Sequence, residues 1–311
     1  MKHIILDTDP GVDDALAFIL AFNSPEIKVE AITTVAGNVN HTKGHRNAKQ
    51  LVEFLGTTDV PVCAGALRPL VKPLEHAEDV HGDTGLGGAV LPKPTLETDK
   101  RSAVEIILEK ANELGKQLTL VAVGPLTNIA VALLADPKLA EKVDKLVIMG
   151  GAFHLTYHGH GNANAVAEFN IWIDPEAAKI VFESGIPIIA AGLDTTTHPE
   201  CRMNREMFER IAAKGTKTSG LVNDLCRPLV EKYNRFSLHD PMAMTYVIDP
   251  SLFTTEKHQV DVECDSNLTR GMTVVERTVW RKDPSKVNVE IIVKVEAEKF
   301  LSLVEERISG E

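Results

Sequence analysis

The chain has 311 residues, 44% of them hydrophobic, which suits one large α/β domain or two small ones with a sizeable core. Its formal net charge is −11 and Lys and Arg are not massed anywhere, which argues against nucleic acid as a partner because phosphate binding needs a basic surface. The four cysteines form no CxxC pair, so we expect neither a zinc site nor a redox motif built from cysteines. No apolar stretch approaches membrane-spanning length, so we expect no membrane-spanning segment.

The N-terminal stretch LDTDPGVDD contains four carboxylates between a strand-like run and a helical pattern. Asp7 and Asp9 end the apolar run, and Asp13 and Asp14 begin the helical one. They should therefore gather at the carboxyl end of a buried strand, where open α/β sheets bind ligands. Anions at one place repel each other unless a cation or shared proton offsets them, and a hard, oxygen-liganded metal ion is the simplest offset.

A purely structural interpretation of the same stretch is that Asp9 caps a helix with Pro10 at its first position. Asp13 and Asp14 would then lie in the first turn, where the helix dipole favours anions. This interpretation leaves the proximity of Asp7 to Asp9 unexplained. Because the chain enters a strand at once, MKHIILDTD leaves no room for a signal peptide, and we expect a reducing, cytoplasmic setting.

Strand-like and helix-like patterns alternate as far as residue 191. The strand-like runs are apolar almost throughout, as in strands that are buried on both faces. Strands are predicted at 4–7, 29–35, 60–64, 118–123, 145–149 and 186–191, and helices at 13–22, 41–55, 102–114, 127–134 and 175–183. This alternation predicts right-handed βαβ units and a Rossmann-like α/β fold, with a mostly parallel central sheet flanked by helices.

The pattern changes in the last third of the chain. Helices are predicted at 202–214, 219–236, 241–247 and 297–308. Runs at 260–264, 273–280 and 287–295 alternate in polarity, which predicts a small antiparallel appendage near the C-terminus. No Gly-, Pro- or Ser-rich linker and no internal repeat interrupts the chain, so we predict a single domain over residues 1–311.

Several polar stretches follow predicted strands, where their side chains could meet the N-terminal carboxylates. They are Gly37-Asn38, the loop HGDTGLGG with His81, the loop GPLTN after Val123, the stretch GHGNANAVAEFN with Asn162, Glu168 and Asn170, and LHDP with His239 and Asp240. Some of these residues could instead have a purely structural role. Asn38 could be a turn residue, and His239 could be a helix cap before Pro241. HGDTGLGG lacks the GxGxxG and GxxxxGK spacings of phosphate loops.

Together these stretches are specific. In order along the chain, DTDPGVDD, ITTVAGN, HGDTGLGG, GPLTNIA, IMGGAF, AEFNIWIDPEAA and LHDP resemble the inosine-uridine nucleoside hydrolase family. The resemblance implies a mostly parallel sheet, one bound calcium ion, and hydrolysis of purine or pyrimidine ribonucleosides to ribose and free base in nucleoside salvage. It also implies a small-molecule nucleoside as the partner and a homodimer or homotetramer.

The resemblance assigns roles residue by residue. Asp9, Asp14, Asp240 and the backbone carbonyl of Val123 match the calcium ligands, and Asp9 also matches the general base. The side chains matching ribose-binding groups are Asp13, Asn38, Asn162, Glu168 and Asn170, while His81 matches a residue near the base. His239 matches the acid proposed to protonate the leaving base in the less selective members of the family. A reference pKa of ~6.5 would let it hold a proton.

Two parts of the assignment stay open at this point. The segment 153–161, FHLTYHGHG, looks longer than usual, so Asn164 is an alternative to Asn162 as the ribose-binding residue. The base pocket is expected to draw on residues 225–236, with Arg227, Tyr233 and Arg235 as candidates, and the preferred base is not readable.

Two other function classes remain as alternatives. An Asp-x-Asp at the end of a first strand also begins the haloacid dehalogenase pattern of phosphatases, but that pattern has Thr two residues after the second Asp, where this chain has Gly11 after Pro10. The second is a calcium-dependent protein that binds a nucleoside or sugar without turnover. The pairing of a candidate base, Asp9, with a candidate acid, His239, argues against it.

Overall fold

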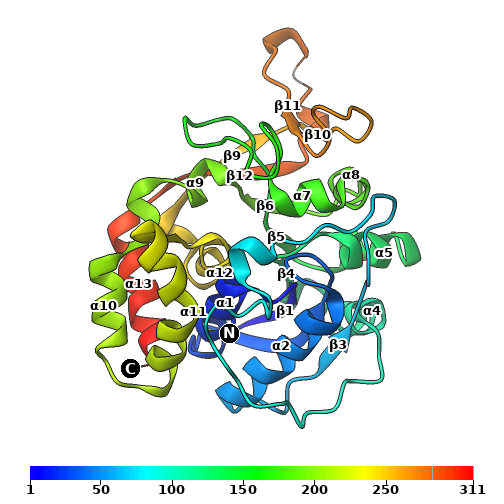
Figure 1. Cartoon of the computed structure of the whole chain (residues 1–311). Helices are drawn as coiled ribbons and strands as arrows, with labels where there is room; N and C mark the ends of the chain where they lie inside the picture. The colour runs from blue at the N-terminus through cyan, green and yellow to red at the C-terminus, as the bar shows by residue number, and fades with distance from the viewer. Residues whose placement is uncertain (282, 311) are drawn as a thin grey trace.

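The computed structural model describes residues 1–281 and 283–310. Its centre is an eight-stranded sheet in the order β3-β2-β1-β4-β5-β6-β12-β9 (Figure 1). Neighbouring strands run parallel except at the β12–β9 edge. The strands are β1 (Lys2–Thr8), β2 (Ile27–Thr34), β3 (Val62–Ala64), β4 (Leu118–Ala122), β5 (Lys145–Met149), β6 (Ile188–Ala191), β9 (Phe253–His258) and β12 (Val289–Val295).

Helices cover both faces of this sheet, and β1 shows how its side chains divide between them. Ile4 and Leu6 pack in the core beneath α1, α2, α10, α11, α12 and α13, whereas Ile5 packs in the core beneath α4, α5, α6 and α8. The alternation follows from the two-residue period of a strand. The helices of the first face are α1 (Val12–Phe22), α2 (His41–Leu55), α10 (Arg205–Ala212), α11 (Lys217–Tyr233), α12 (His239–Ile248) and α13 (Ala297–Ser309); those of the second are α4 (Ala103–Leu114), α5 (Thr127–Ala135), α6 (Leu139–Lys142) and α8 (Pro175–Glu183).

Local sequence signals set several helix ends. The Asn40 side chain accepts the Lys43 N–H at 3.0 Å and so caps α2, which stops before Gly56 in the left-handed region at φ +74°. Ser102 and Glu105 form a reciprocal capping box at the start of α4. The short helices are α3 (Glu78–His81), α7 (Phe169–Ile173) and α9 (Leu193–Thr196).

The six strands and five helices predicted up to residue 191 are confirmed, with ends that differ by a few residues. The predicted small antiparallel appendage is also confirmed, as β10 (Val260–Val262) paired with β11 (Thr273–Val275). The single-domain prediction over residues 1–311 includes positions 282 and 311, which lie outside the described residues, and it stays a prediction. Within the described ranges, no helix has the length and apolar character needed to cross a membrane.

The assignment of residues 287–295 to the appendage was wrong. β12 instead joins the main sheet, parallel to β6 and antiparallel to β9, and β9 was missed. Its polarity alternates because it lies near the sheet edge, so the pattern suggested an antiparallel strand without identifying its partners. The predicted helices 202–214 and 219–236 are also too long, because Arg202–Asn204 (β7) and Arg235–Ser237 (β8) pair as a two-stranded ribbon.

The order of the strands fixes where a ligand can bind. From β1 the chain passes to β2 and β3 on one side of the sheet and later to β4, β5 and β6 on the other. In open sheets, a crevice opens at the carboxyl ends of the strands where the winding direction switches, here between β1 and β4. The loops that follow β1, β2 and β4 therefore converge at that point.

Candidate active site

A cavity of about 520 Å³ opens at this switch point. Its size is that of a small-molecule site. Most of the residues that the sequence singled out line it, namely Asp13, Asn38, His81, Val123, Asn162, Glu168, Asn170, His239 and Asp240. Asp9 and Asp14 lie behind this wall and are completely buried.

Three buried carboxylates meet at the floor of the cavity. Asp13, Asp14 and Asp240 each place one carboxylate oxygen within 4.8 Å of the others. Burial raises the pKa of all three, to about 6 for Asp13 and well above its usual value for Asp240, where the charges of Asp13 and Asp14 add to the effect. Such a cluster is stable only if a cation or protons offset the repulsion, and its all-oxygen donor set suits a hard cation. Asp13, which the resemblance assigns to ribose binding, thus lies in this acidic cluster, as the grouping of the N-terminal carboxylates predicted.

Asp9 is wedged between two loops. Its Oδ2 accepts the N–H of Asn38 at 2.7 Å. A Cβ atom on Gly37 would lie 2.1 Å from that oxygen, and one on Gly124 would lie 2.6 Å from Oδ1. The two glycines thus allow the loops after β2 and β4 to close around the carboxylate. Oδ1 is buried and has no hydrogen-bond partner among the described residues, so it is free to accept a proton or bind a cation.

Asp14 organises the turn between β1 and α1. It accepts hydrogen bonds from the Thr8 hydroxyl, from the Gly11 N–H at 2.8 Å and from Nδ2 of Asn38 at 3.1 Å. The helix begins at Val12, so the interpretation of Asp9 as its cap is wrong. Asn38 is more than a turn residue, because its backbone and side chain together bind Asp9 and Asp14.

Asp7 does not join the cluster. Its side chain has the strand parity of Ile5, and its Oδ1 accepts from Thr33 Oγ1 at 2.5 Å and Asn128 Nδ2 at 2.7 Å. Burial raises its pKa to about 7. The grouping of four carboxylates was therefore correct for three of them, and Asp7 instead links β1 to β2 and α5.

The AEFN segment supplies the opposite wall. Glu168 caps α7, and its carboxylate accepts the N–H groups of Gly151, Asn170 and Ile171 at 2.8–3.1 Å. Burial raises its pKa to about 7. Nδ2 of Asn170 donates to the carbonyls of Val123, at 2.9 Å, and Met149, at 3.1 Å. These bonds orient both side chains rigidly at the end of β5.

Asn162, rather than Asn164, lies on the cavity wall. Its Oδ1 accepts the Phe169 N–H at 2.9 Å, and its amide nitrogen has no hydrogen-bond partner among the described residues. Asn164 is occupied elsewhere, since its Oδ1 accepts two backbone N–H groups and its Nδ2 donates to the Arg270 carbonyl at 3.0 Å. The position of Asn162 thus agrees with the first of the two assignments, while contact with ribose stays a prediction.

The two candidate histidines are held by specific partners. Nδ1 of His81 accepts the Val12 N–H at 3.1 Å, and burial lowers its pKa. Nδ1 of His239 lies 2.9 Å from Thr196 Oγ1. His239 is the first residue of α12 rather than its cap, and burial, with Arg202 and His81 nearby, lowers its pKa to about 4. Burial thus disfavours the imidazolium of His239 in the free protein, and the role of His239 as the acid stays a prediction.

Known proteins share the sequence pattern and the fold of this chain. The family model described as inosine-uridine preferring nucleoside hydrolase matches residues 4–302. The chain belongs to this family. It is 41% identical over 312 aligned residues to the pyrimidine-specific ribonucleoside hydrolase RihA of Escherichia coli O7:K1, covering 98% of this chain and 97% of RihA. It is thus an N-ribosyl hydrolase, which removes the phosphatase and the binding protein without turnover as alternatives.

Solved structures share the whole fold. The plant nucleoside hydrolase PpNRh1 superposes with a TM-score of 0.90 at 35% identity, covering 100% of this chain and 99% of that one. The purine-preferring ribonucleoside hydrolase of Gardnerella vaginalis gives 0.90 at 34%, covering 99% and 98%. The chain is thus similar in sequence to a protein named pyrimidine-specific and in backbone to one named purine-preferring.

The cavity wall formed by α3, the end of α11 and β8 is called the base side here, because the base pocket is predicted there. It combines buried residues such as Phe236 with exposed ones. Val80 is 47% exposed and Tyr233 is 53% exposed. Tyr233 and Arg235 line the cavity, as expected, but Arg227 does not and instead contacts Asn223 and Glu231 on the outside of α11. Sequence reasoning missed several lining residues, His76, Asp79, Val80, Phe169, Trp172 and Ser237. Most of them stand in or beside the quoted motifs, since Asp79 and Val80 precede HGD, Phe169 and Trp172 lie within AEFNIWIDPEAA, and Ser237 precedes LHDP.

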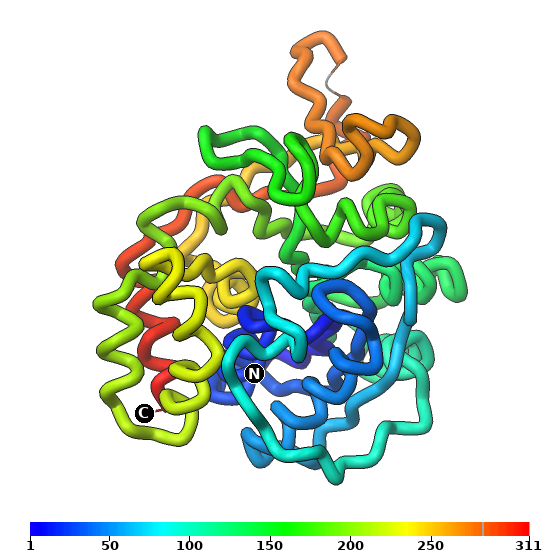
Figure 2. The backbone as a smooth tube through the Cα atoms, viewed as in Figure 1, coloured from blue at the N-terminus to red at the C-terminus, as the bar shows by residue number. Residues whose placement is uncertain are grey.

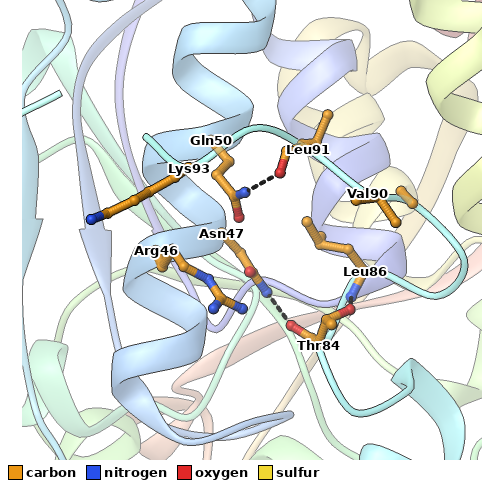
Figure 3. A pocket seen from close by; sticks show the side chains of 9 residues that line it. Arg46, Asn47, Gln50, Thr84, Leu86, Val90, Leu91 and Lys93 are labelled. Atoms are coloured by element: carbon orange, nitrogen blue, oxygen red, sulfur yellow. Dashed lines mark hydrogen bonds between the residues drawn. The ribbon is translucent and has the colours of Figure 1, made fainter. Parts of the chain in front are cut away.

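A second hollow, of about 460 Å³, lies between α2 and the loop that follows His81 (Figure 3). Asn47 at its wall donates to the carbonyls of Pro10, at 3.2 Å, and Thr84, at 2.8 Å. This side chain therefore fastens the Asp9 turn and the His81 loop of the nucleoside hydrolase to one rigid helix.

Proposed function

We propose that this enzyme cleaves the N-glycosidic bond of ribonucleosides with the help of a bound calcium ion, and that it serves nucleoside salvage. The observation that carries the proposal is the buried cluster of Asp13, Asp14 and Asp240 beside the unpartnered Oδ1 of Asp9. Among the described residues no Lys or Arg forms an ion pair with these carboxylates, and the one histidine within ion-pair distance, His81, lies 4.0 Å from Asp13. A divalent cation is therefore the simplest counter-charge.

The donors present suit calcium, which takes six to eight oxygen ligands from carboxylates, carbonyls and hydroxyls. Asp9, Asp14, Asp240 and the Val123 carbonyl would hold it, with Asp13 at hand. When bound, calcium lowers the pKa of a nearby water and attracts the ribose hydroxyl oxygens.

The remaining steps belong to the chain's own side chains. Asp9 is the proposed general base, because its Oδ1 is rigidly placed and has no donor of its own. Removing a proton from water at this oxygen supplies the nucleophile that attacks the sugar carbon. The bond to the base breaks through an oxocarbenium-like state, as in other glycoside hydrolyses.

We propose that ribose is held by the sugar side of the cavity, defined as Asp9, Asp13, Asp14, Asn38, Asn162, Glu168, Asn170 and Asp240. Glu168 supports this role because its carboxylate is fixed by three N–H donors and still lines the cavity. A rigid acceptor positioned in this way strengthens its bond to a hydroxyl as positive charge develops on the ring.

The leaving base would lie near His81 and His239. A neutral His239 can still donate a hydrogen bond through one ring nitrogen, since Thr196 holds the other. Full proton transfer from His239 would require the bound nucleoside to raise its pKa. We propose a pyrimidine ribonucleoside as the preferred substrate, because the relative named pyrimidine-specific is more similar in sequence than the structure named purine-preferring.

A reducing-sugar assay with uridine and inosine tests the proposal directly. We expect ribose release from both with uridine the better substrate, loss of release after removal of divalent ions, and recovery with calcium. No release from either nucleoside at any calcium concentration would contradict it. Light scattering on the same preparation tests the expected homodimer or homotetramer.

A further inference from the structure

The β10–β11 hairpin, residues 260–281, stands out from the body beside the loop that follows β5 (Figure 2). Its base is fixed in the protein core by Val260, Val262 and Val275. None of its described residues lines the active-site cavity. Any influence on the reaction must therefore pass through the segments that the hairpin contacts.

One of these contacts is a buried threonine. The Thr273 hydroxyl donates to the Ala152 carbonyl at 2.8 Å and accepts the Ala152 N–H at 3.1 Å, and Thr273 is only 1% exposed. A single side chain thus satisfies both backbone groups of Ala152. The preceding residue, Gly151, donates its N–H to Oε2 of Glu168 at 3.1 Å.

The residues before Thr273 hold the other end of the same segment. Met272 forms an antiparallel bridge with Ala167, the residue directly before Glu168. Gly271, at φ +84°, lies against α7, where a Cβ atom would come within 2.7 Å of Trp172 Cα. Residues 271–273 therefore contact the chain on both sides of Glu168.

We propose that Thr273 is a positioning residue for the ribose-binding carboxylate of Glu168. It fixes Ala152, and through Ala152 the Gly151 N–H that sets the orientation of Oε2. This inference rests on the proposed function, in which Glu168 holds a ribose hydroxyl. Removal of the hydroxyl leaves a buried N–H and a buried carbonyl without partners, and the segment around Gly151 relaxes to satisfy them.

The experiment compares Thr273→Val with Thr273→Ser. Valine keeps the shape and removes both hydrogen bonds, whereas serine keeps the hydroxyl. Thr269→Val is the matched control, because it lies in the same hairpin and its hydroxyl has no hydrogen bond among the described residues. Since displacement of a binding group by about 1 Å costs on the order of 10²-fold, we expect kcat/KM for uridine to fall by roughly 10- to 100-fold in Thr273→Val.

The loss should appear more in kcat than in KM, because contacts to ribose tighten in the transition state. Thr273→Ser should restore most of the activity, and Thr269→Val should retain it. Hydrogen–deuterium exchange of residues 150–173, measured well below the melting temperature, should rise in Thr273→Val alone.

The outcomes separate the two proposals. Wild-type exchange in Thr273→Val overturns the positioning role, whatever the activity. Faster exchange with unchanged kcat/KM shows that the hairpin orders this segment but that Glu168 does not hold the ribose, which contradicts its role in the proposed function. Loss of activity in Thr269→Val as large as in Thr273→Val would show a general effect of the hairpin and would also overturn the inference.

Discussion

The sugar side and the base side of one cavity are built in different ways. On the sugar side, Asp9 and Asp14 are fully buried and Glu168 is 2% exposed, and backbone N–H groups hold each carboxylate. On the base side, Val80 and Tyr233 are about half exposed. A buried network can have only one arrangement without leaving polar groups unpaired, whereas exposed side chains can change at little cost.

Under the proposed function, this difference explains how proteins similar to this chain can carry names of opposite base preference. Ribose is common to all ribonucleosides, so the rigid sugar side suits the constant part of the substrate. The open base side suits the variable part. Changes on the sugar side should therefore reduce hydrolysis strongly for every nucleoside. Changes on the base side should have smaller effects that depend on the base.

The largest expected effect is that of metal removal. A strong chelator should abolish hydrolysis and lower the melting temperature, and calcium should restore both, because a ligand that binds only the native state stabilises it. Full activity in protein shown by elemental analysis to be free of metal would contradict this prediction.

Asp240→Asn sharpens the test of the acidic cluster. Burial and the charges of Asp13 and Asp14 raise the pKa of Asp240, so its charged form is costly in the metal-free folded protein. The neutral amide should therefore make the metal-free variant more stable than metal-free wild type, while calcium should no longer stabilise or activate it. Thermal unfolding with and without calcium gives both comparisons, and equal calcium stabilisation in variant and wild type would exclude Asp240 as a ligand.

The second effect concerns the 2′-hydroxyl. A site built to bind a hydroxyl leaves its own polar groups unpaired when that hydroxyl is absent, and the penalty is on the order of 10⁴-fold in kcat/KM. 2′-Deoxyuridine should therefore be a very poor substrate. Asn170→Ala should narrow the gap between uridine and 2′-deoxyuridine, and a wild-type ratio near one would mean that the sugar side does not read the diol.

The third effect concerns His239, which lines the cavity near both the sugar side and the base side. His239→Ala should lower uridine and inosine hydrolysis by roughly 10²- to 10⁴-fold if His239 acts as an acid. Hydrolysis of a nitrophenyl riboside should be spared, because its leaving group departs without a proton. Equal losses on both kinds of substrate would assign His239 a structural role through its bond to Thr196.

The two sides also differ in how far the sequence predicted them. Asp9, Asp13 and Asp14 are close in space because a single turn joins β1 to α1, so their spacing alone brought them together. Even there, the two-residue period of β1 places the Asp7 side chain on the opposite face of the sheet. The spacing of the carboxylates in the sequence did not indicate this. The alternation of strands and helices was readable for the same local reason.

Features that depend on distant partners were not readable. Thr273 forms hydrogen bonds with Ala152, which is 121 residues away in the sequence. The strands that pair with β12 in the main sheet cannot be identified from the local sequence of β12. The lowered pKa of His239 depends on burial, which its neighbours in sequence do not determine. Arg227 and Tyr233 lie on one helix, yet only Tyr233 faces the cavity.

The smallest expected effect is on the base side, and Arg227 supplies its control. Tyr233→Ala should change the ratio of kcat/KM for uridine and inosine by roughly 3- to 10-fold, the size of a half-exposed aromatic contact. Arg227→Ala, on the same helix but outside the cavity, should leave that ratio unchanged. Both variants should keep the wild-type discrimination against 2′-deoxyuridine, because neither touches the buried sugar network. A change in that discrimination in Tyr233→Ala would show that the two sides are coupled and that the division between a rigid and an adjustable end does not hold.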